Sequence, residues 1–238
     1  MLSIVLPSYK GADILKKHLP DFIRYLKQKG FAFEIIVVDD GSQDAGATQI
    51  VAEENGCFYM ANPRNLGKGA AVRKGMLAAK GDFRIYTDVD IPFRFPVIDQ
   101  FLRYLDFKEF DVVIGDRTLP QSAYFTQIPL LRKIGSRVMS LIIGRFVAGG
   151  MFDTQCGIKG FRADVAEDLF SRSRIRGFAF DVELLYIALK RNYDIKRLPV
   201  QLRCNEGSSV NVLRDGLGMS LDLLRLKWNH LRGLYDKR

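Results

Sequence analysis

Short apolar runs alternate with amphipathic stretches through the first half of the chain. Each run of four to seven residues, rich in Ile, Val, Phe and Tyr, predicts a β-strand, and the predicted strands cover 2–6, 34–39, 57–60, 82–88 and 111–115. The stretches between them show helical periodicity, as in Leu15, Leu19, Phe22 and Leu26, and predict helices ending near Gly30 and covering 44–55, 67–80 and 97–106. This alternation predicts an α/β fold with a mostly parallel central sheet flanked by helices.

The second half is less regular. It predicts helices at 163–171 and 179–190 and a strand at 194–203. Residues 128–150 are apolar and carry basic residues but no acidic ones. The tail from 214 to 238 has an apolar seam with alternating spacings of four and three: Leu217, Leu221, Leu224, Trp228, Leu231 and Tyr235. We interpret this seam as a core helix or as the contact of a homodimer.

Composition narrows the class of protein. The 238 residues are 47% hydrophobic, which suits a single globular domain. The net charge of +9 favours phosphate-bearing partners, namely nucleotides or an anionic membrane surface. No recognition helix, aromatic platform or basic arm indicates nucleic acid, so we expect no nucleic-acid partner. No uncharged apolar stretch reaches about 18 residues, so we expect no membrane-spanning helix.

The cysteines indicate the compartment. Cys57, Cys156 and Cys204 are widely separated and odd in number, with neither metal-ligand spacing nor a disulfide framework. We therefore expect buried thiols in a reducing compartment.

Paired acids follow two of the predicted strands. In an extended segment, residues i and i+2 point the same way, so Asp88 and Asp90 can converge on one hard divalent cation. Asp39 and Asp40 end the strand at 34–39. They either bind a ribose or base edge or simply form the turn with Gly41. Carboxylates at the ends of neighbouring parallel strands predict a ligand crevice along that edge of the sheet.

Two further turns carry basic side chains, Lys68 and Arg117. Asn65-Leu66-Gly67-Lys68-Gly69 lacks the P-loop spacing, and no G-x-G-x-x-G follows a strand, which argues against a nicotinamide or flavin site. The turn at 65–69 opens a helix and either faces an anion or is an ordinary helix start with a solvated lysine. Arg117 follows the strand at 111–115, either to bind phosphate or to form a surface ion pair. We interpret His18 and His230 as structural.

Taken in order, these motifs resemble glycosyltransferase family 2. The matching strings are Pro7-Ser8-Tyr9, Val38-Asp39-Asp40-Gly41-Ser42, Asn65-Leu66-Gly67-Lys68-Gly69, Asp88-Val89-Asp90 and Gly115-Asp116-Arg117. Two further strings are similar to the branch that makes dolichyl- or polyprenyl-phosphate sugars: Asp153-Thr154-Gln155-Cys156-Gly157-Ile158-Lys159-Gly160-Phe161 and Phe180-Asp181-Val182-Glu183-Leu184-Leu185. The chain departs from the family pattern at Ile91, where a polar residue often follows the second aspartate.

The resemblance implies a GT-A fold and a nucleotide-diphosphate sugar donor of the UDP-glucose or GDP-mannose type. It also implies Mg²⁺ or Mn²⁺, inversion at the anomeric carbon and a polyprenyl phosphate acceptor. We expect residues 1–210 to form the catalytic domain, 211–238 an amphipathic C-terminal helix, and 128–150 a membrane-interface segment. The protein would then be cytoplasmic and peripheral on the cytoplasmic face of the membrane.

The resemblance also implies roles for individual residues. Nucleotide binding would fall to Pro7, Ser8, Tyr9, Asp39, Asp40, Gly41, Ser42, Asn65, Lys68 and Gly69. Asp88 and Asp90 would bind the metal, and Arg117, Arg132 and Lys159 would contact phosphates. Asp153, Gln155 and Asp181 would line the sugar and acceptor region, with Asp90, Arg117 and Asp181 as catalytic residues.

The nature of the acceptor decides whether a general base is needed. A lipid phosphate, whose second pKa is about 6, is already ionised at neutral pH and needs cations rather than a base. A sugar hydroxyl needs a carboxylate base, for which Asp181 is the candidate. A third alternative is a catalytically silent nucleotide-sugar-binding module.

Overall fold

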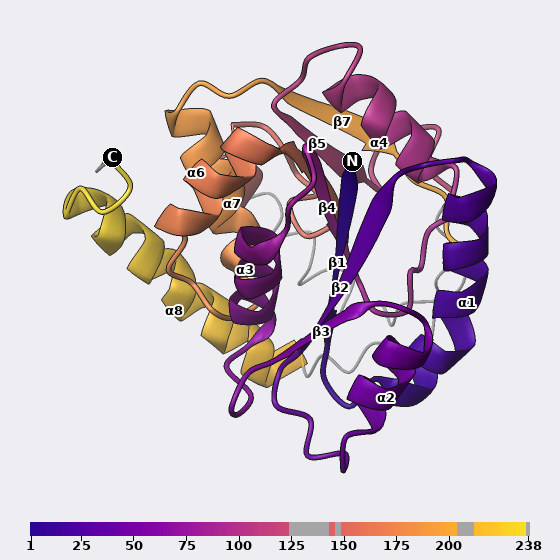
Figure 1. The fold of residues 1–238 in the computed structure, drawn as a ribbon. Helices are drawn as coiled ribbons and strands as arrows, with labels where there is room; N and C mark the ends of the chain where they lie inside the picture. The colour runs from indigo at the N-terminus through magenta and orange to yellow at the C-terminus, as the bar shows by residue number, and fades with distance from the viewer. Residues whose placement is uncertain (124–142, 146–148, 204–211, 237–238) are drawn as a thin grey trace.

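A seven-stranded sheet forms the centre of the protein in a computed structural model that describes residues 1–123, 143–145, 149–203 and 212–236 (Figure 1). Its strand order is β3-β2-β1-β4-β6-β5-β7. Neighbouring strands are parallel except at β6, which is antiparallel to both β4 and β5. The strands are β1 (Leu2–Ser8), β2 (Phe33–Asp39), β3 (Phe58–Ala61), β4 (Phe83–Thr87), β5 (Val112–Asp116), β6 (Ile158–Arg162) and β7 (Ile195–Pro199).

Helices cover both faces of the sheet (Figure 1). One face packs against α1 (Ala12–Gln28), α2 (Ala47–Glu54) and α4 (Val97–Leu105). The other packs against α3 (Lys68–Ala78), α6 (Ala163–Arg172), α7 (Phe180–Lys190) and α8 (Val212–Leu231). The prediction of an α/β fold with a mostly parallel sheet is therefore confirmed.

The hydrophobic pattern located most of these elements correctly. The predicted face of α1, Leu15, Leu19, Phe22 and Leu26, is fully buried. Every residue of β1 is buried, as expected for a parallel strand with helices on both sides. The remaining strands and helices of the first half lie within a few residues of their predicted bounds, which is the usual uncertainty of helix and strand ends.

Strand β6 was not predicted. Its sequence, Ile158 to Arg162, holds Lys159 and Gly160 and has neither a clean alternation nor an apolar run. Gly160 is required here because a Cβ atom at this position would lie 2.9 Å from the Phe101 ring of α4. A strand that contains a lysine and a glycine for tertiary reasons carries no periodic signal of its own.

Much of the predicted membrane-interface segment lies outside the described residues, and so does Arg132. In the described part of 128–150, Ile143 is buried and Arg145 is exposed.

The C-terminal seam is more exposed than a core helix would be. Tyr235 is buried, but Leu221, Leu224, Trp228 and Leu231 are between 57% and 78% exposed.

Two cysteines match their prediction. Cys57 and Cys156 are buried free thiols. Burial raises the pKa of Cys57 to about 11 and that of Cys156 to about 12, so both are inert at neutral pH. Among the helices described, none combines the length and the apolar character needed to cross a bilayer.

Candidate active site

Functional side chains converge where the parallel strands end. β1, β2, β4 and β5 all run in the same direction, so their carboxyl ends share one edge of the sheet. Asp39 ends β2, Asp88 follows β4 directly, and Asp116 ends β5. β6 starts between β4 and β5, so the segment that precedes it, 153–157, enters the same edge. The topology thus brings the strand-end carboxylates to one edge of the sheet, and the ligand crevice there stays a prediction.

A tight turn holds Asp88 and Asp90. The Ile91 amide donates to the Asp88 carbonyl at 2.9 Å, and Ile91 adopts a positive φ of 44°. This left-handed conformation is strained for a β-branched residue, and such strain tends to occur at functional sites. The Ile91 side chain is buried and anchors the turn. Lys68, in the first turn of α3, places its ammonium 2.5 Å from Asp88 Oδ1.

The charged side chains in and beside this turn have shifted pKa values. Burial, and then the neighbouring charge of Asp88, raise the pKa of Asp90 to about 6. Burial acts to lower the pKa of Lys68, but the carboxylates of Asp88 and Asp181 outweigh it and the net pKa is raised. Two carboxylates that repel each other beside a half-exposed strand end are suited to bind an additional cation.

A glycine makes room for the Asp88 carboxylate. A Cβ atom on Gly157 would lie 2.0 Å from Asp88 Oδ2, so any other residue would push this carboxylate away. The described residues hold no group of three His, Cys, Asp or Glu side chains that could bind a metal. A cation at Asp88 and Asp90 would thus share its coordination with substrate phosphate and water, which is the usual manner of Mg²⁺. The donor set fits the metal implied by the resemblance.

His18 also belongs to this region, although the sequence indicated only a structural role. It is 3% exposed and lies close enough to Asp90 for a positive charge on its ring to lower the pKa of that carboxyl. Arg203 Nη2 lies 3.0 Å from His18 Nδ1 and, because arginine can only donate, Nδ1 accepts this hydrogen bond. Nothing in the spacing of His18 relative to the aspartates could have shown this proximity.

The first aspartate pair is saturated by the protein itself. Asp39 and Asp40 are only 5% and 4% exposed. Asp40 accepts hydrogen bonds from Asn62 at 2.7 Å and from the amides of Leu66 and Gly67 at 3.0 and 2.8 Å. Asp40 therefore shapes the turn that leads into α3, and its predicted contact with a ribose or base stays a prediction.

Asp39 is similarly occupied. Its Oδ1 accepts from the amide of Ser42 at 3.0 Å and from the Ser42 hydroxyl, and its Oδ2 accepts from Tyr59 at 3.0 Å. Gly41 has a φ of 75°, and a Cβ there would lie 2.4 Å from the backbone of Arg64. The Asp-Gly-Ser string thus brings this turn against the 64–67 loop.

The turn at 65–69 is fixed by glycines. A Cβ on Gly67 would lie 2.4 Å from the Arg176 carbonyl oxygen, and one on Gly69 would lie 2.6 Å from Phe180. This packing sets α3 against the loop before α7 and aims Lys68 at Asp88. Asn65 stays exposed. Of the two interpretations, the solvated lysine is wrong, because Lys68 pairs with a carboxylate of the site.

The β1 end supplies an exposed aromatic side chain. Pro7 and Ser8 are buried, and the Ser8 hydroxyl has no hydrogen-bond partner within the described residues. Tyr9 is 49% exposed at the same edge. The Lys10 amide donates to the Ser42 hydroxyl at 2.6 Å and ties this end to the turn after β2. Tyr9 alone of the Pro-Ser-Tyr string is open to a ligand.

Arg117 and Asp153 form one unit. Arg117 donates from Nε and Nη2 to the two oxygens of Asp153 at 2.8 and 2.6 Å, and its amide adds a third bond at 2.7 Å. Burial acts to raise the pKa of Asp153, but Arg117 outweighs it and the net pKa is lowered. The guanidinium remains 33% exposed while Asp153 is 6% exposed. Asp153 thus orients Arg117, and its predicted place in the sugar region stays a prediction.

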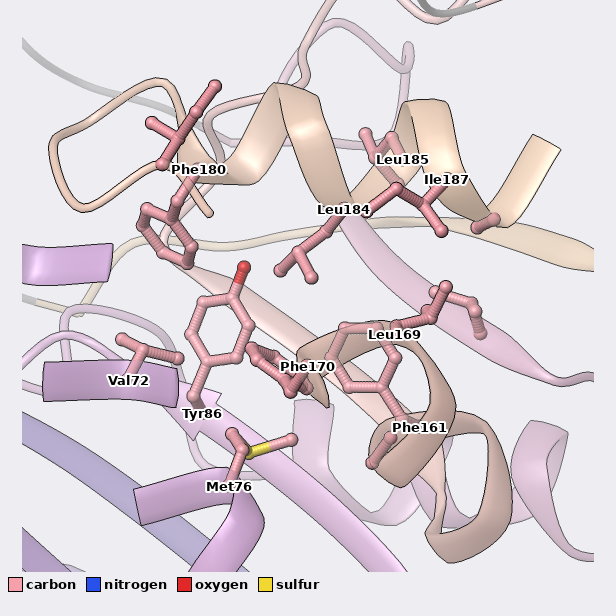
Figure 2. Packing of buried hydrophobic residues seen from close by; sticks show 14 of the residues in the cluster. Val72, Met76, Tyr86, Phe161, Leu169, Phe170, Phe180, Leu184, Leu185 and Ile187 are labelled. Atoms are coloured by element: carbon pink, nitrogen blue, oxygen red, sulfur yellow. The ribbon is translucent and has the colours of Figure 1, made fainter. Parts of the chain in front are cut away.

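Lys159 and Asp181 form a second, fully buried unit. Lys159 is 0% exposed and Asp181 3% exposed. Asp181 Oδ1 accepts from both the Lys159 ammonium and the Tyr86 hydroxyl, and Lys159 also donates to the Cys156 carbonyl at 3.0 Å. Figure 2 shows Tyr86 among Phe161, Phe170 and Phe180 with its hydroxyl oxygen directed towards α7. Lys159 was predicted to contact phosphate; here its ammonium lies inside the core, and the phosphate contact stays a prediction.

Glu183, two residues after Asp181 in the string 180–185, fastens two other segments, which the sequence did not reveal. Its Oε2 accepts from the amides of Arg174 and Ile175 at 2.9 and 2.8 Å. Its Oε1 accepts from the Tyr235 hydroxyl at 2.7 Å. Burial raises the pKa of Glu183 although these bonds oppose the shift. Glu183 therefore fastens both the loop before α7 and the residues after α8. Gln155 lies nearby and donates to the Phe178 carbonyl at 3.3 Å.

Comparison with known proteins agrees with this geometry. The family model described as Glycosyl transferase family 2 matches residues 3–170. The chain belongs to glycosyltransferase family 2. It is therefore a glycosyltransferase, and the resemblance stated from the motifs is confirmed.

Curated relatives match over nearly the whole chain. A dolichyl-phosphate beta-glucosyltransferase of Trichomonas vaginalis is 33% identical, over 94% of this chain and 72% of the relative. Those of Dictyostelium discoideum and Homo sapiens are each 29% identical over 98% of this chain, and the matches cover 76% and 77% of them.

Solved structures share the fold. Mannosyl-3-phosphoglycerate synthase from Rubrobacter xylanophilus aligns with a TM-score of 0.72 at 20% identity, over 98% of this chain and 75% of that one. Glucosyl-3-phosphoglycerate synthase from Mycobacterium tuberculosis, in complex with Mn²⁺, UDP and glucosyl-3-phosphoglycerate, aligns with a TM-score of 0.66 at 19% identity, over 95% and 78%. The fold is GT-A, as expected from the resemblance.

Proposed function

We propose that this glycosyltransferase moves glucose from a nucleotide-diphosphate sugar to a polyprenyl phosphate, with inversion at the anomeric carbon. The names of the relatives support glucose and a dolichyl-type phosphate. The observation that carries the choice of acceptor is the burial of Asp181, whose Oδ1 already accepts from Lys159 and Tyr86. A carboxylate held in this way is poorly placed to take a proton from a sugar hydroxyl, whereas a phosphate acceptor needs no base.

We choose the substrate-contacting residues by the exposure of their side chains. We assign them to Tyr9, Lys68, Asp88, Asp90 and Arg117, which are all partly open at the carboxyl edge of the sheet. Tyr9 would stack on the base of the nucleotide. Among the other predicted site residues, Asp40 fixes the turn that leads to Lys68, and Asp153 orients Arg117.

Charge neutralisation is the chemical task of the site. Asp88 and Asp90 would hold Mg²⁺ or Mn²⁺, whose charge, when bound, stabilises the departing nucleoside diphosphate as a Lewis acid. Lys68 adds a positive charge beside the same carboxylates. Arg117, pre-oriented by Asp153, presents a planar guanidinium suited to the acceptor phosphate. Cations held in advance lower the repulsion between two anionic substrates.

The decisive test is a donor and acceptor screen. Purified protein is incubated with Mn²⁺ and a short polyprenyl phosphate, with either UDP-glucose or GDP-mannose, and the lipid product is read by mass spectrometry. We expect a polyprenyl phosphoglucose from UDP-glucose and none from the Asp88→Asn variant. Transfer to sugar or lipid hydroxyls, with the lipid phosphate left unmodified, would refute the proposed acceptor. Transfer from GDP-mannose alone would refute the proposed sugar.

We further infer that the protein works at the cytoplasmic face of the membrane as a peripheral protein, because the acceptor is membrane-bound and the net charge is +9.

A further inference from the structure

One side of α8 presents large apolar side chains to solvent. Leu221, Leu224, Trp228 and Leu231 are 57%, 66%, 61% and 78% exposed. Their spacings of three and four residues place them along one stripe of the helix. We call this stripe the outer face of α8. Scattered single apolar residues are normal on a protein surface, but four in a row on one helix indicate a contact.

The helix is fixed to the protein by its opposite side. Leu226 is 1% exposed in the core that also contains α3, α6 and α7. Directly after the helix, Tyr235 is 1% exposed and donates to the buried Glu183 at 2.7 Å. The orientation of α8 is therefore set by the core, and its outer face is directed to solvent by this packing.

Basic side chains predominate among the exposed charges that border the outer face, although Asp236, farther along the chain, is exposed and acidic. From Gly218 to Arg232 the exposed charged side chains are Arg225, Lys227 and Arg232. Asp222 is 13% exposed and pairs with Arg225 at 2.9 Å. In a symmetric dimer built on this face, the basic side chains of two copies would meet, which is unfavourable. A negatively charged partner complements both the apolar stripe and its basic border.

The side of α8 that packs on the protein lies beside the candidate active site. Met219, in the same helix, has its sulfur 3.4 Å from the side-chain amide of Gln155, which neighbours the segment that orients Arg117. Asp222 lies against Gly177 in the loop before α7, where a Cβ would be 3.1 Å from its carboxylate. In Figure 1 the first turns of α8 lie at the end of the molecule towards which β1 runs from the N-terminus.

We propose that the outer face of α8 docks on an anionic lipid bilayer, with the helix lying in the interface. Leucine and tryptophan side chains enter the headgroup region while arginine and lysine pair with lipid phosphates, as in interfacial amphipathic helices. This orientation brings the carboxyl edge of the sheet next to the membrane. It deepens the proposed function, since a polyprenyl phosphate would then reach the site from the bilayer.

Vesicle co-sedimentation tests the surface without donor or acceptor. Vesicles of phosphatidylcholine with phosphatidylglycerol are compared with phosphatidylcholine alone, at low and high salt. We expect wild type to bind the anionic vesicles in a salt-sensitive manner. Leu224→Ser combined with Trp228→Ser should weaken binding by about tenfold or more. Lys227→Gln combined with Arg232→Gln should weaken it several-fold at low salt and remove part of its salt dependence.

A matched control separates this surface from general hydrophobicity. Ile50 and Phe107 are 54% and 81% exposed on other elements, so Ile50→Ser combined with Phe107→Ser removes comparable apolar side chains. We expect this control to bind like wild type. If control and α8 variants lose binding equally, or if wild type stays in solution at low salt, the docking surface is wrong. Circular dichroism melts of all variants show whether the fold is kept.

Two further measurements distinguish the occupant and the function. Sedimentation velocity should give a monomer at micromolar concentration; a dimer dissolved by Leu224→Ser and Trp228→Ser would assign the face to a second copy and overturn the proposal. Transfer to a short soluble polyprenyl phosphate should be unchanged in that variant, while transfer to a long-chain acceptor in vesicles should fall. Vesicle binding without any lipid-phosphate transfer would refute the proposed acceptor and leave the docking surface standing.

Discussion

Two aspartate pairs occupy equivalent places in the sheet and have opposite surroundings. Asp39 and Asp40 follow β2, and Asp88 and Asp90 follow β4, so both pairs lie at the carboxyl edge. The first pair is at most 5% exposed, and its oxygens accept from residues of the surrounding turns. The second pair is partly open, and the pKa of Asp90 is raised to about 6.

The difference shows that the same residue type at the same topological place can serve architecture or chemistry. The number of hydrogen-bond donors that the chain offers to each carboxylate decides between these two roles. Asp40 receives two backbone amides and one side-chain amide, so it needs no ligand. Asp88 and Asp90 repel each other, with the Lys68 ammonium close to Asp88, so the cation that we propose there would relieve this repulsion.

The largest expected effect is a loss of activity on substitution in the second aspartate pair. Asp90→Asn should lower kcat of sugar transfer by about a thousandfold, because charge stabilisation at the leaving diphosphate is lost. Steady-state kinetics with saturating donor measures this, and Asp21→Asn, at an exposed surface site, serves as the control. Turnover within a factor of a few of wild type would show that the second pair is structural as well.

The next effect separates the pairs by stability. Asp40→Ala should lower the free energy of unfolding by about 3 kcal/mol, because the amides of Leu66 and Gly67 would lose their buried partner. Urea denaturation measures the loss, and Asp90→Asn should show none. An unchanged midpoint for Asp40→Ala would mean that solvent satisfies these amides and that the first pair is less structural than its bonds indicate.

The smallest effect is a pH dependence of the metal-free protein. The folded pKa of Asp90, about 6, lies above the unfolded value of 3.8, so the folded state binds this proton more tightly. Charged Asp90 therefore lowers stability above pH 6, and this penalty disappears as the pH falls from about 6 to about 4.

The matched variant isolates that contribution from other titrating carboxyls. With a chelator present, Asp90→Asn should be more stable than wild type by about 1–2 kcal/mol at pH 7, after allowance for solvent screening, and equally stable near pH 4. Equal stability at both pH values would contradict the repulsion inferred between Asp88 and Asp90.

The sequence by itself determined the fold class, the family and the edge of the sheet at which we propose the active site. Hydrophobic periods located the helices and the parallel strands, because burial of an apolar face is a local property of a segment. The string Asp88-Val89-Asp90 marked two partly open carboxylates at the end of β4. They lie in a turn, however, and not in the extended segment that the sequence predicted.

Tertiary structure decided the division of labour within the motifs. Lys159 and Asp181 bond to each other inside the core, Asp153 orients Arg117, and Gly157 makes room for Asp88. The sequence predicted neither strand β6 nor the exposure of the outer face of α8. An apolar seam has the same spacing whether it packs against a core or faces solvent. Each of these outcomes depends on which distant segment supplies the neighbouring atom, and no spacing along the chain encodes that.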